Sequence, residues 1–423
     1  MVNSALTQNE LYCKQWRARP IRLTFLVFMF SLFLYPIGSS EGLSLNYSFA
    51  LFPVIALLFL GKRLTNLPNV MAAGLVLFTF ILFVACIYQY DLYDLAIRRF
   101  VSFVLFITLF TFAFIRIDSQ MVVAFKIAVV LMSAYFAIST ITEFAVLSSI
   151  GPVGYEAKRL VGSQRYGFVY LFGFWIVLLY QPSSRIYLPI KFVTLFVLTA
   201  ALFLSFSRSP IVALAGSLAI YLLFSVWQVL MRPKLKHVLK FSSVMIAICV
   251  SILLTYFYLP LTFRFYNDRL IKPISTGVLI ANAVSRGGSE GKRVHIIETS
   301  LDFLLSNPAT GTGYLGVWTL PSAESGSAHN QYLDVLLRVG WFGFVFYCYL
   351  IWRLLRYLAK LDRQLFWGLV GILIYGLFNE TFKESQGAFV LAFLLGMLAQ
   401  SIRDNTSRTN RTHYVITAEV GEP

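Results

Sequence analysis

Long apolar segments recur along almost the whole chain, and they limit what the chain can fold into. A helix that crosses the hydrocarbon core of a bilayer needs roughly 20 mostly apolar residues. Runs such as "LVLFTFILFVACI" are apolar on every face, whereas the strands of a membrane barrel alternate apolar and polar residues. Together with 58% hydrophobic and only 13% charged residues, this pattern predicts an all-α polytopic membrane protein.

The apolar segments predict about twelve transmembrane helices. They lie near 21–38, 45–61, 69–87, 98–116, 121–144, 167–181, 186–204, 210–231, 241–260, 331–352, 365–378 and 386–402. One large, more polar loop, 261–328, separates the ninth span from the tenth. We expect residues 1–402 to form a single transmembrane domain that includes this loop, and residues 403–423 to form a disordered tail.

The basic residues orient this bundle, because lysines and arginines that flank membrane spans stay on the cytoplasmic side. The groups on that side are Lys14, Arg17, Arg19 and Arg22, then Lys62 and Arg63, the stretch "RPKLKHVLK", the group Arg353, Arg356, Lys360 and Arg363, and finally Arg403, Arg408 and Arg411. The N-terminus and the tail are therefore predicted inside, and the loop 261–328 outside. Much of the net charge of +16 is a topological signal and a complement to membrane lipids, so we expect no nucleic-acid partner.

Metal and nucleotide chemistry find little support in the sequence. The four cysteines show no paired spacing, and the four histidines form no cluster with cysteines or carboxylates. No "GxxxxGK" sequence for binding phosphates appears. We therefore expect neither a metal ion nor an organic cofactor.

Several basic residues lie in outward loops, against the positive-inside rule, and they are candidates for function. Arg208 lies in the short loop "SFSRSP", where Ser209 can cap the next helix and Pro210 suits its first turn. A guanidinium beside free helix amides makes a good phosphate site. The alternative is that Arg208 only caps the helix or reaches to the interface. Another outward loop carries Arg159 and Arg165.

The large loop contains "EGKRVHIIETSLDFLLSNPATGTGYLG", which predicts an amphipathic helix followed by a glycine-rich turn. The apolar positions at helical spacing are Val294, Ile297, Leu301, Leu304 and Leu305. We expect this helix to lie on the outer membrane interface. Arg293 falls in its first turn, which is unfavourable for the helix dipole, so a bound anion would stabilise it there. Pairing with Glu290 or with a lipid phosphate would serve equally.

A histidine precedes the tenth span in "GSAHNQYLDVLLRVG". Ser325 or Ser327 can cap a helix that begins near His329, which would place the imidazole at the outer mouth of the span. The residues on the same face of that helix would be Tyr332, Leu333 and Leu336. The histidine can act as a base, or it can simply bond a backbone carbonyl. Asp334 and Arg338 are four residues apart, a spacing at which their charges can pair inside the bundle.

These segments carry a resemblance to a known family. The loop "SFSRSP", the loop with "GKRVHIIETSLDFLLSNPATGTGYLG" and the segment "SAHNQYLDVLLRVGWFGF" together resemble the O-antigen ligase and O-antigen polymerase superfamily of bacterial lipid-linked glycan transferases. The motifs cover the second half of the chain. The topology of about twelve spans with one large late periplasmic loop resembles that family, and lipid-linked (GT-C-like) glycosyltransferases, over the whole chain.

The resemblance implies a multi-pass protein of the bacterial inner membrane whose active site faces the periplasm. It implies a metal-independent, inverting glycosyltransferase of lipopolysaccharide biosynthesis that takes a glycan from undecaprenyl diphosphate. His329 matches the family's catalytic histidine. Arg208 and Arg293 match residues expected to bind the donor diphosphate, and Arg159 and Arg165 fall where such proteins carry further basic residues.

Three functions stay open. A ligase would transfer the glycan to a lipid A core acceptor, which the histidine segment and the loop placement favour. A polymerase would transfer it to a second lipid-linked glycan. A transporter or flippase for lipid-linked sugars is more remote, because such proteins carry internal repeats and charges near the bilayer midplane. The sequence also leaves open whether Glu380 or Glu384 in the last outward loop contributes to the site.

Overall fold

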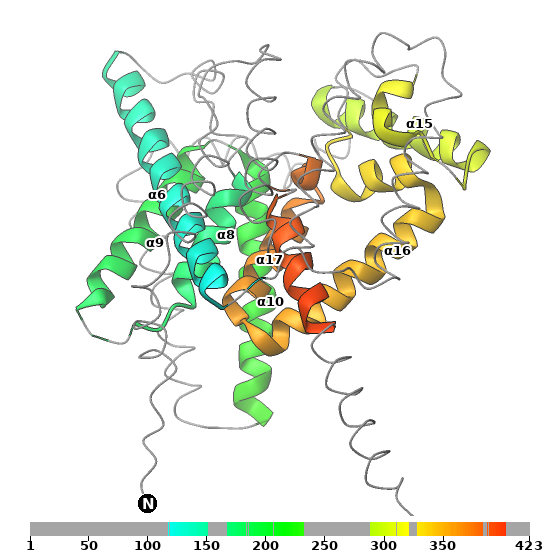
Figure 1. The fold of residues 1–423 in the computed structure, drawn as a ribbon. Helices are drawn as coiled ribbons and strands as arrows, with labels where there is room; N and C mark the ends of the chain where they lie inside the picture. Colours follow the sequence, from blue (N-terminus) through cyan, green and yellow to red (C-terminus); the bar gives the residue numbers. More distant parts are fainter. Residues whose placement is uncertain are drawn as a thin grey trace, which may run out of the picture. The chain divides into compact units, whose positions relative to one another are not determined.

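The computed structural model is helical throughout the part that it describes, and within that part no strand occurs (Figure 1). The described residues are 117, 119–150, 167–182, 184, 186–205, 207–231, 288–309, 311–320, 328–383, 387 and 389–402. The helices are α6 (Ser119–Ile150), α8 (Gly167–Leu178), α9 (Tyr187–Leu204), α10 (Arg208–Met231), α15 (Gly288–Ser306), α16 (Gln331–Leu361) and α17 (Arg363–Tyr375), with two short 3-10 helices, η6 (Gly313–Thr319) and η7 (Thr381–Lys383).

The chain divides into two compact units. Unit 1 comprises Met1–Thr79, Phe100–Ala128 and Glu384–Pro423, and unit 2 comprises Phe80–Arg99 and Val129–Lys383. Within unit 1, Phe125 stacks on Phe393 with ring centroids 4.2 Å apart, and the Gln400 side chain accepts the Ile117 amide at 2.7 Å. Every candidate site residue that the structure describes belongs to unit 2.

The apolar helices occur where hydropathy predicts them. Four are long and apolar enough to cross a membrane, namely Met121–Val146, Tyr187–Leu204, Arg208–Trp227 and Gln331–Leu361. Three shorter apolar helices, Gly167–Leu178, Arg363–Tyr375 and Phe389–Ile402, also coincide with predicted spans. The predicted spans 21–38, 45–61, 69–87, 98–116 and 241–260 lie outside the described residues.

Helix α8 lies against α6, α9 and α17 within unit 2 (Figure 1). All 12 of its residues are buried, and at 1.5 Å per residue it is about 18 Å long, well short of the hydrocarbon core of a bilayer. Polar contacts fasten it to α6. The Ser133 hydroxyl donates to the Val169 carbonyl at 2.9 Å, and Thr140 bonds the Tyr170 hydroxyl at 2.8 Å. The segment 167–181 is thus a half-length core helix where a full span was predicted.

Glycines let α17 pack closely against α8 and α10. A Cβ on Gly368 would lie 2.2 Å from the Phe172 ring, so only glycine fits at this contact. Trp175 of α8 and Trp367 of α17 stack at 5.4 Å, and Tyr221 of α10 meets both rings. Offset and edge contacts of this kind add about 0.5–1.5 kcal/mol per pair beyond the burial of their surface. These contacts fix the three helices against one another.

We expect Gly368→Ala to destabilise the protein by about 1–3 kcal/mol, because the added methyl group forces the Phe172 ring out of its place. Gly216→Ala is a matched control, since its Cβ would meet Ile374 at an ordinary 3.5 Å. Alanine also favours a helix by up to ~1 kcal/mol over glycine. The thermal midpoint in detergent should therefore fall for Gly368→Ala and hold or rise for Gly216→Ala. Equal midpoints would contradict the packing argument.

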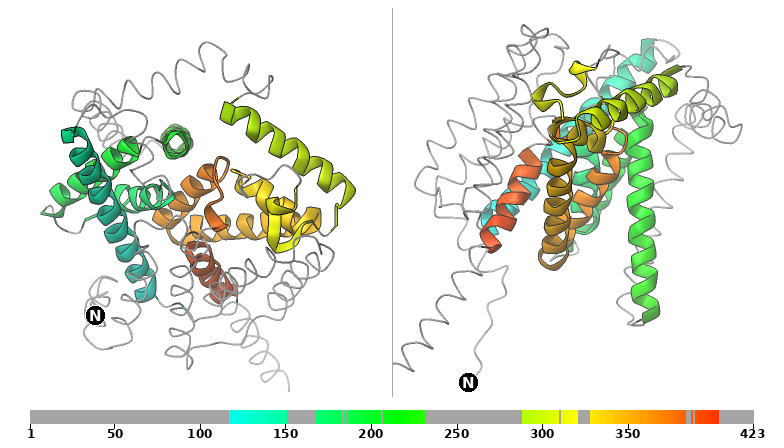
Figure 2. Two further views of the ribbon diagram at one scale, coloured as in Figure 1. Left: turned by 90° about the horizontal axis from the view of Figure 1, so that it is seen from above. Right: turned by 90° about the vertical axis from the view of Figure 1, so that its right-hand side faces the viewer.

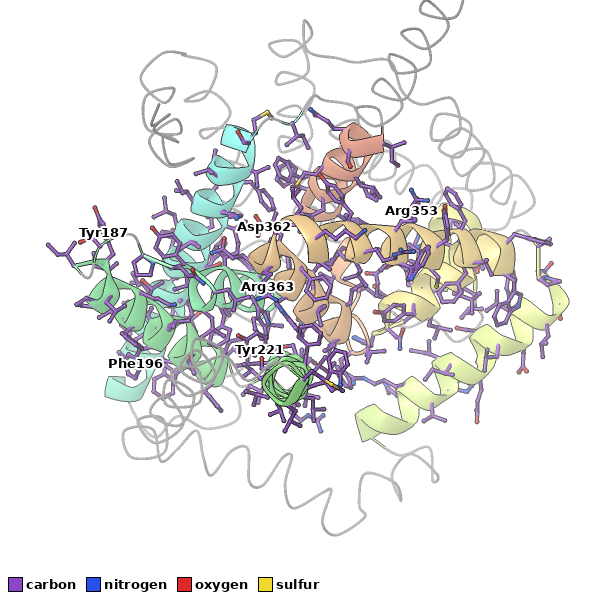
Figure 3. All side chains as sticks on the ribbon, turned by 90° about the horizontal axis from the view of Figure 1, so that it is seen from below. Tyr187, Phe196, Tyr221, Arg353, Asp362 and Arg363 are labelled. Atoms are coloured by element: carbon purple, nitrogen blue, oxygen red, sulfur yellow. The ribbon has the colours of Figure 1, made fainter. Side chains whose placement is uncertain are left out.

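Helices α16 and α17 form a hairpin joined at a single residue, Asp362, which Figure 3 labels. The Asp362 amide donates to the Leu358 carbonyl at 2.8 Å and so ends α16. Its carboxylate accepts the amides of Gln364 and Leu365 at 3.0 and 3.2 Å and so caps α17. A hairpin returns the end of α17 to the beginning of α16, where the histidine segment lies.

Candidate functional site

The ends of four helices meet at one end of unit 2. A Cβ on Gly167, where α8 begins, would lie 3.0 Å from Pro210 of α10 and 3.2 Å from the Tyr375 ring of α17. The next residue after α17, Gly376, accepts the Gln331 amide of α16 at 2.7 Å. The start of α10, which carries Arg208, and the start of α16, which His329 precedes, therefore lie at the same end.

Arg208 is the first residue of α10 and is partly buried. Pro210 lies in the first turn, as predicted, but Ser209 is the second residue of the helix and is not its cap. The first four amides of a helix have no partner within the helix, so the backbone here favours an anion. The guanidinium of Arg208 adds a full positive charge at the same place.

His329 has an unusual backbone conformation. Among the described residues it is the only non-glycine residue with a positive φ, at 50°. Histidine enters this left-handed region more readily than most residues, but such a position still costs of the order of 1–3 kcal/mol. It persists only where the surroundings hold the backbone in place.

The cap of α16 is Asn330, whose side chain accepts the amides of Tyr332 and Leu333 at 2.9 and 3.0 Å. The prediction that Ser325 or Ser327 caps a helix containing His329 is wrong. His329 lies two residues before the helix begins, so it shares no helical face with Tyr332. Asn330 has the extended backbone of a cap residue, and its two side-chain hydrogen bonds fix where α16 starts.

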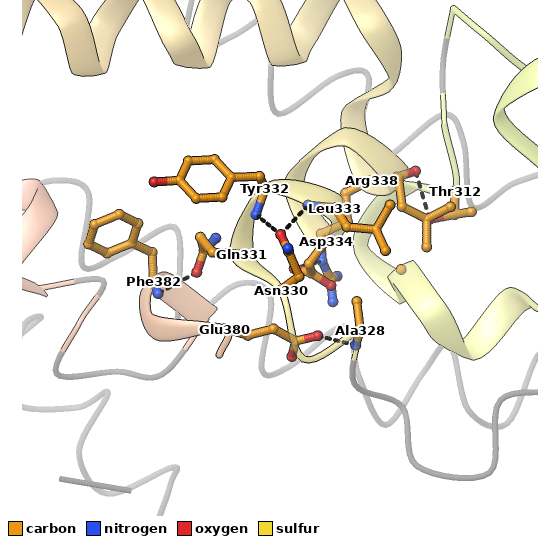
Figure 4. Close-up of polar contacts among 12 residues, drawn as sticks. Thr312, Ala328, Asn330, Gln331, Tyr332, Leu333, Asp334, Arg338, Glu380 and Phe382 are labelled. Atoms are coloured by element: carbon orange, nitrogen blue, oxygen red, sulfur yellow. Dashed lines mark hydrogen bonds and ion pairs between the residues drawn. The ribbon is translucent and has the colours of Figure 1, made fainter. Parts of the chain in front are cut away.

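Glu380, which sequence analysis left open, contacts the histidine segment directly. Its carboxylate accepts the amide of Ala328, the residue before His329 (Figure 4). On the other side of His329, Asn330 donates from its side-chain amide to the Leu377 carbonyl at 3.1 Å. The second glutamate left open, Glu384, lies outside the described residues.

The predicted charge pair on α16 is confirmed. Arg338 Nε lies 2.8 Å from Asp334 Oδ2, and the two side chains are 18% and 3% exposed. The Arg338 guanidinium packs against Gly316 of η6, where a Cβ would lie 2.6 Å from Nη2. Since each charge neutralises the other, Arg338 can be held in the protein without a bound anion. The pair fastens η6 to α16.

Helix α16 is broken at Gly340, where φ is 65° and ψ is −174°. The Trp341 amide, which would bond Leu337 in a continuous helix, donates to the Pro308 carbonyl at 3.0 Å. The Leu337 carbonyl accepts the Thr312 amide at 2.7 Å instead. The segment 308–312 thus fills the break. Most residues of 331–339 are buried in unit 2, whereas side chains beyond the break, such as Phe342 at 77%, are exposed.

Helix α15 lies crosswise to α10 (Figure 2). It packs on the start of α16 through one buried cluster, whose members are Ile296, Leu304, Val317, Leu320, Ala328, Leu333, Leu336 and Leu337. Arg293 is partly buried and lies one turn before Ile296, while His329 directly follows Ala328. The cluster therefore joins the α15 turn after Arg293 to the histidine segment.

The predicted apolar positions of α15 divide between two faces. Leu304 is buried in the cluster, while Ile297, Leu301 and Leu305 are exposed. The exposed positions follow one another at helical spacing, so the helix keeps an outward apolar stripe suited to a membrane interface. The inward face was not evident from the sequence, because Ile296 and Ile297 are adjacent and hydropathy alone does not say which is buried.

The structure thus gathers two of the predicted site residues, Arg208 and His329, at one end of unit 2, and links the helix of Arg293 to the histidine segment. Arg159 and Arg165 lie outside the described residues and remain predictions. Within the described residues, no three histidine, cysteine or acidic side chains group as metal ligands.

The apolar helices and this polar end identify the class of the molecule as a helical, multi-pass membrane protein. Residues 192–348 match the protein family described as O-antigen ligase. The match supports the resemblance to the O-antigen ligase and polymerase superfamily that was predicted from the sequence. Arg208, Arg293 and His329 all fall within the matched residues. No curated protein matches the chain.

Proposed function

We propose that the protein is an O-antigen ligase that transfers a glycan from undecaprenyl diphosphate to a lipid A core acceptor on the periplasmic face of the inner membrane. The family match supports an O-antigen-ligase-type function. The observation that carries the proposal is the position of Arg208 and His329, which lie more than a hundred residues apart in the sequence and at the same end of unit 2.

The donor half of the reaction needs positive charge. When the bond between the anomeric carbon and the diphosphate oxygen breaks, the diphosphate leaves with the electron pair and its negative charge grows. Arg208, with the positive end of the α10 helix dipole, and Arg293 of α15 neutralise this charge. Preorganised donors aimed at developing charge are commonly the largest single contribution to catalysis.

The acceptor half needs a base. His329 takes the proton of the acceptor hydroxyl as the oxygen attacks the anomeric carbon from the side opposite the leaving diphosphate, so the configuration at that carbon inverts. An unperturbed imidazole has a pKa near ~6.5, which suits proton transfer at neutral pH. The left-handed backbone of His329 fits this role, because strained residues concentrate at functional sites.

The test uses purified protein in detergent with an undecaprenyl-diphosphate glycan and two acceptors, lipid A core and a second lipid-linked glycan, offered separately. Arg208→Gln is assayed beside wild type, and Arg356→Gln, near the opposite end of α16, is the control for loss of one charge. We expect product on lipid A core, a fall of ~10²-fold or more for Arg208→Gln, and no change for Arg356→Gln.

The acceptor decides between the two enzyme reactions. Chain growth on the second lipid-linked glycan, without product on lipid A core, would make the protein a polymerase with the same donor site. Absence of product on both acceptors, with protein that unfolds cooperatively and elutes as a single species, would overturn the proposed transfer and favour a transporter of lipid-linked sugars.

A further inference from the structure

The segment 376–383, which follows α17 and includes η7, holds the chain on both sides of His329 (Figure 4). We call it the clamp segment. Before the histidine, the Glu380 carboxylate accepts the Ala328 amide. After it, the carbonyls of Leu377 and Gly376 accept the Asn330 side chain at 3.1 Å and the Gln331 amide at 2.7 Å.

The clamp segment is itself tied to α16. The buried Gln331 side chain accepts the Phe382 amide at 2.7 Å, and the Tyr332 hydroxyl donates to Leu373 near the end of α17 at 2.8 Å. Because α17 packs on the buried helix α8, the clamp segment is anchored to the core of unit 2. The clamp segment therefore fixes the position of the chain around His329 relative to that core.

We propose that Glu380 is a positioning residue that holds the histidine segment in its left-handed conformation through the Ala328 amide. The inference rests on the proposed function for its effect on catalysis. Asn330 and Gln331 fix the backbone after His329 through the carbonyls of Leu377 and Gly376. Before His329, the clamp segment contacts the backbone through the Glu380 carboxylate, which accepts the Ala328 amide.

The chemistry of the contact explains the residue type. A carboxylate accepting a backbone amide is a charge-assisted hydrogen bond, about twice as strong as a neutral one. Such a bond offsets part of the free energy that the left-handed conformation of His329 costs. Without it the backbone at His329 relaxes, and a base displaced by about 1 Å can lose ~10²-fold in rate.

Glu380 could act by positioning the backbone or by its negative charge alone, and these two roles predict opposite results for two substitutions. Glu380→Gln keeps the length and an acceptor oxygen but loses the charge, whereas Glu380→Asp keeps the charge but falls one methylene short of the Ala328 amide. If Glu380 positions His329, Glu380→Gln should keep kcat within a few-fold of wild type. Glu380→Asp and Glu380→Ala should lower kcat by ~10–100-fold with KM unchanged, because the residue does not touch the substrate.

Thr381→Val is the matched control. Thr381 is the next residue, is 2% exposed, and its hydroxyl makes no hydrogen bond within the described part of the chain. Replacing a buried hydroxyl without a partner by an apolar group of the same shape is nearly neutral. This variant should therefore match wild type in kcat and in thermal midpoint.

A second readout does not depend on activity. Amide hydrogen exchange of the peptide containing residues 328–332 should be faster than wild type in Glu380→Ala and Glu380→Asp, and close to wild type in Glu380→Gln and Thr381→Val. Wild-type exchange in Glu380→Ala, or a greater loss of kcat in Glu380→Gln than in Glu380→Asp, would overturn the proposal. If wild type transfers to neither acceptor, the proposed function fails, while the exchange experiment still decides whether Glu380 holds this segment.

Discussion

Substitution of His329 by alanine is expected to lower kcat for glycan transfer by about 10²–10⁴-fold, the range typical for loss of a general base. The physical reason is that the acceptor hydroxyl then has to lose its proton to water while it attacks the anomeric carbon. KM for the lipid-linked donor should stay close to wild type, because the proposed site binds the donor diphosphate through Arg208 and Arg293 and not through His329. Initial rates at several donor concentrations, in detergent, measure both constants.

Two variants control for the backbone of His329. His329→Gly adopts the left-handed conformation freely, so it removes the imidazole without adding strain. His329→Asn keeps a polar side chain that tolerates this conformation but does not act as a base. If the imidazole is the base, both should be as inactive as His329→Ala. Activity retained in His329→Gly would mean that the residue only shapes the turn, and the base would have to be sought elsewhere.

The helices and the local pair on α16 could be predicted because their signals lie close together in the sequence. Hydropathy located the apolar helices, and the four-residue spacing of Asp334 and Arg338 predicted their contact. The length of α8 could not be predicted in this way. A core helix and a membrane span are equally apolar, and only the neighbours that surround α8 distinguish them.

The candidate site depends on contacts between remote segments, which sequence spacing does not encode. Glu380 is 52 residues from Ala328, and nothing in the pattern around either residue indicates that they meet. The cap at Asn330 could have been predicted from the residue type, but two upstream serines were equally eligible. Choosing the wrong cap moved His329 into the helix, and with it the direction in which the histidine was expected to point.

The break in α16 explains how one continuous stretch of sequence serves two environments. Residues 331–339 are packed in unit 2 beside the clamp segment, and the chain beyond Gly340 exposes large apolar side chains, as a surface facing lipid would. A straight helix would fix the direction of both parts at once. The break lets the part that follows His329 take its direction from the clamp segment and from 308–312.

Gly340→Ala should therefore have the largest effect on stability, a loss of the order of 3–5 kcal/mol, because two penalties act at one residue. With φ at 65° and ψ at −174°, the backbone lies in a region open essentially to glycine alone. A Cβ would also lie 2.6 and 2.7 Å from the carbonyl oxygens of Ala309 and Pro308, which are backbone atoms with little freedom to move. Thermal unfolding in detergent measures the loss.

Amide hydrogen exchange at single residues should distinguish loss of the break at Gly340 from a general loss of stability. If the added methyl group expels 308–312 from the break, the amides of Thr312 and Trp341 lose their carbonyl partners and exchange faster than amides of α8. Phe342→Ala, two residues away at an exposed position, should change neither amide. A Gly340→Ala protein as stable as Gly216→Ala, with both amides still protected, would show that the break tolerates a side chain at residue 340 and would contradict both penalties.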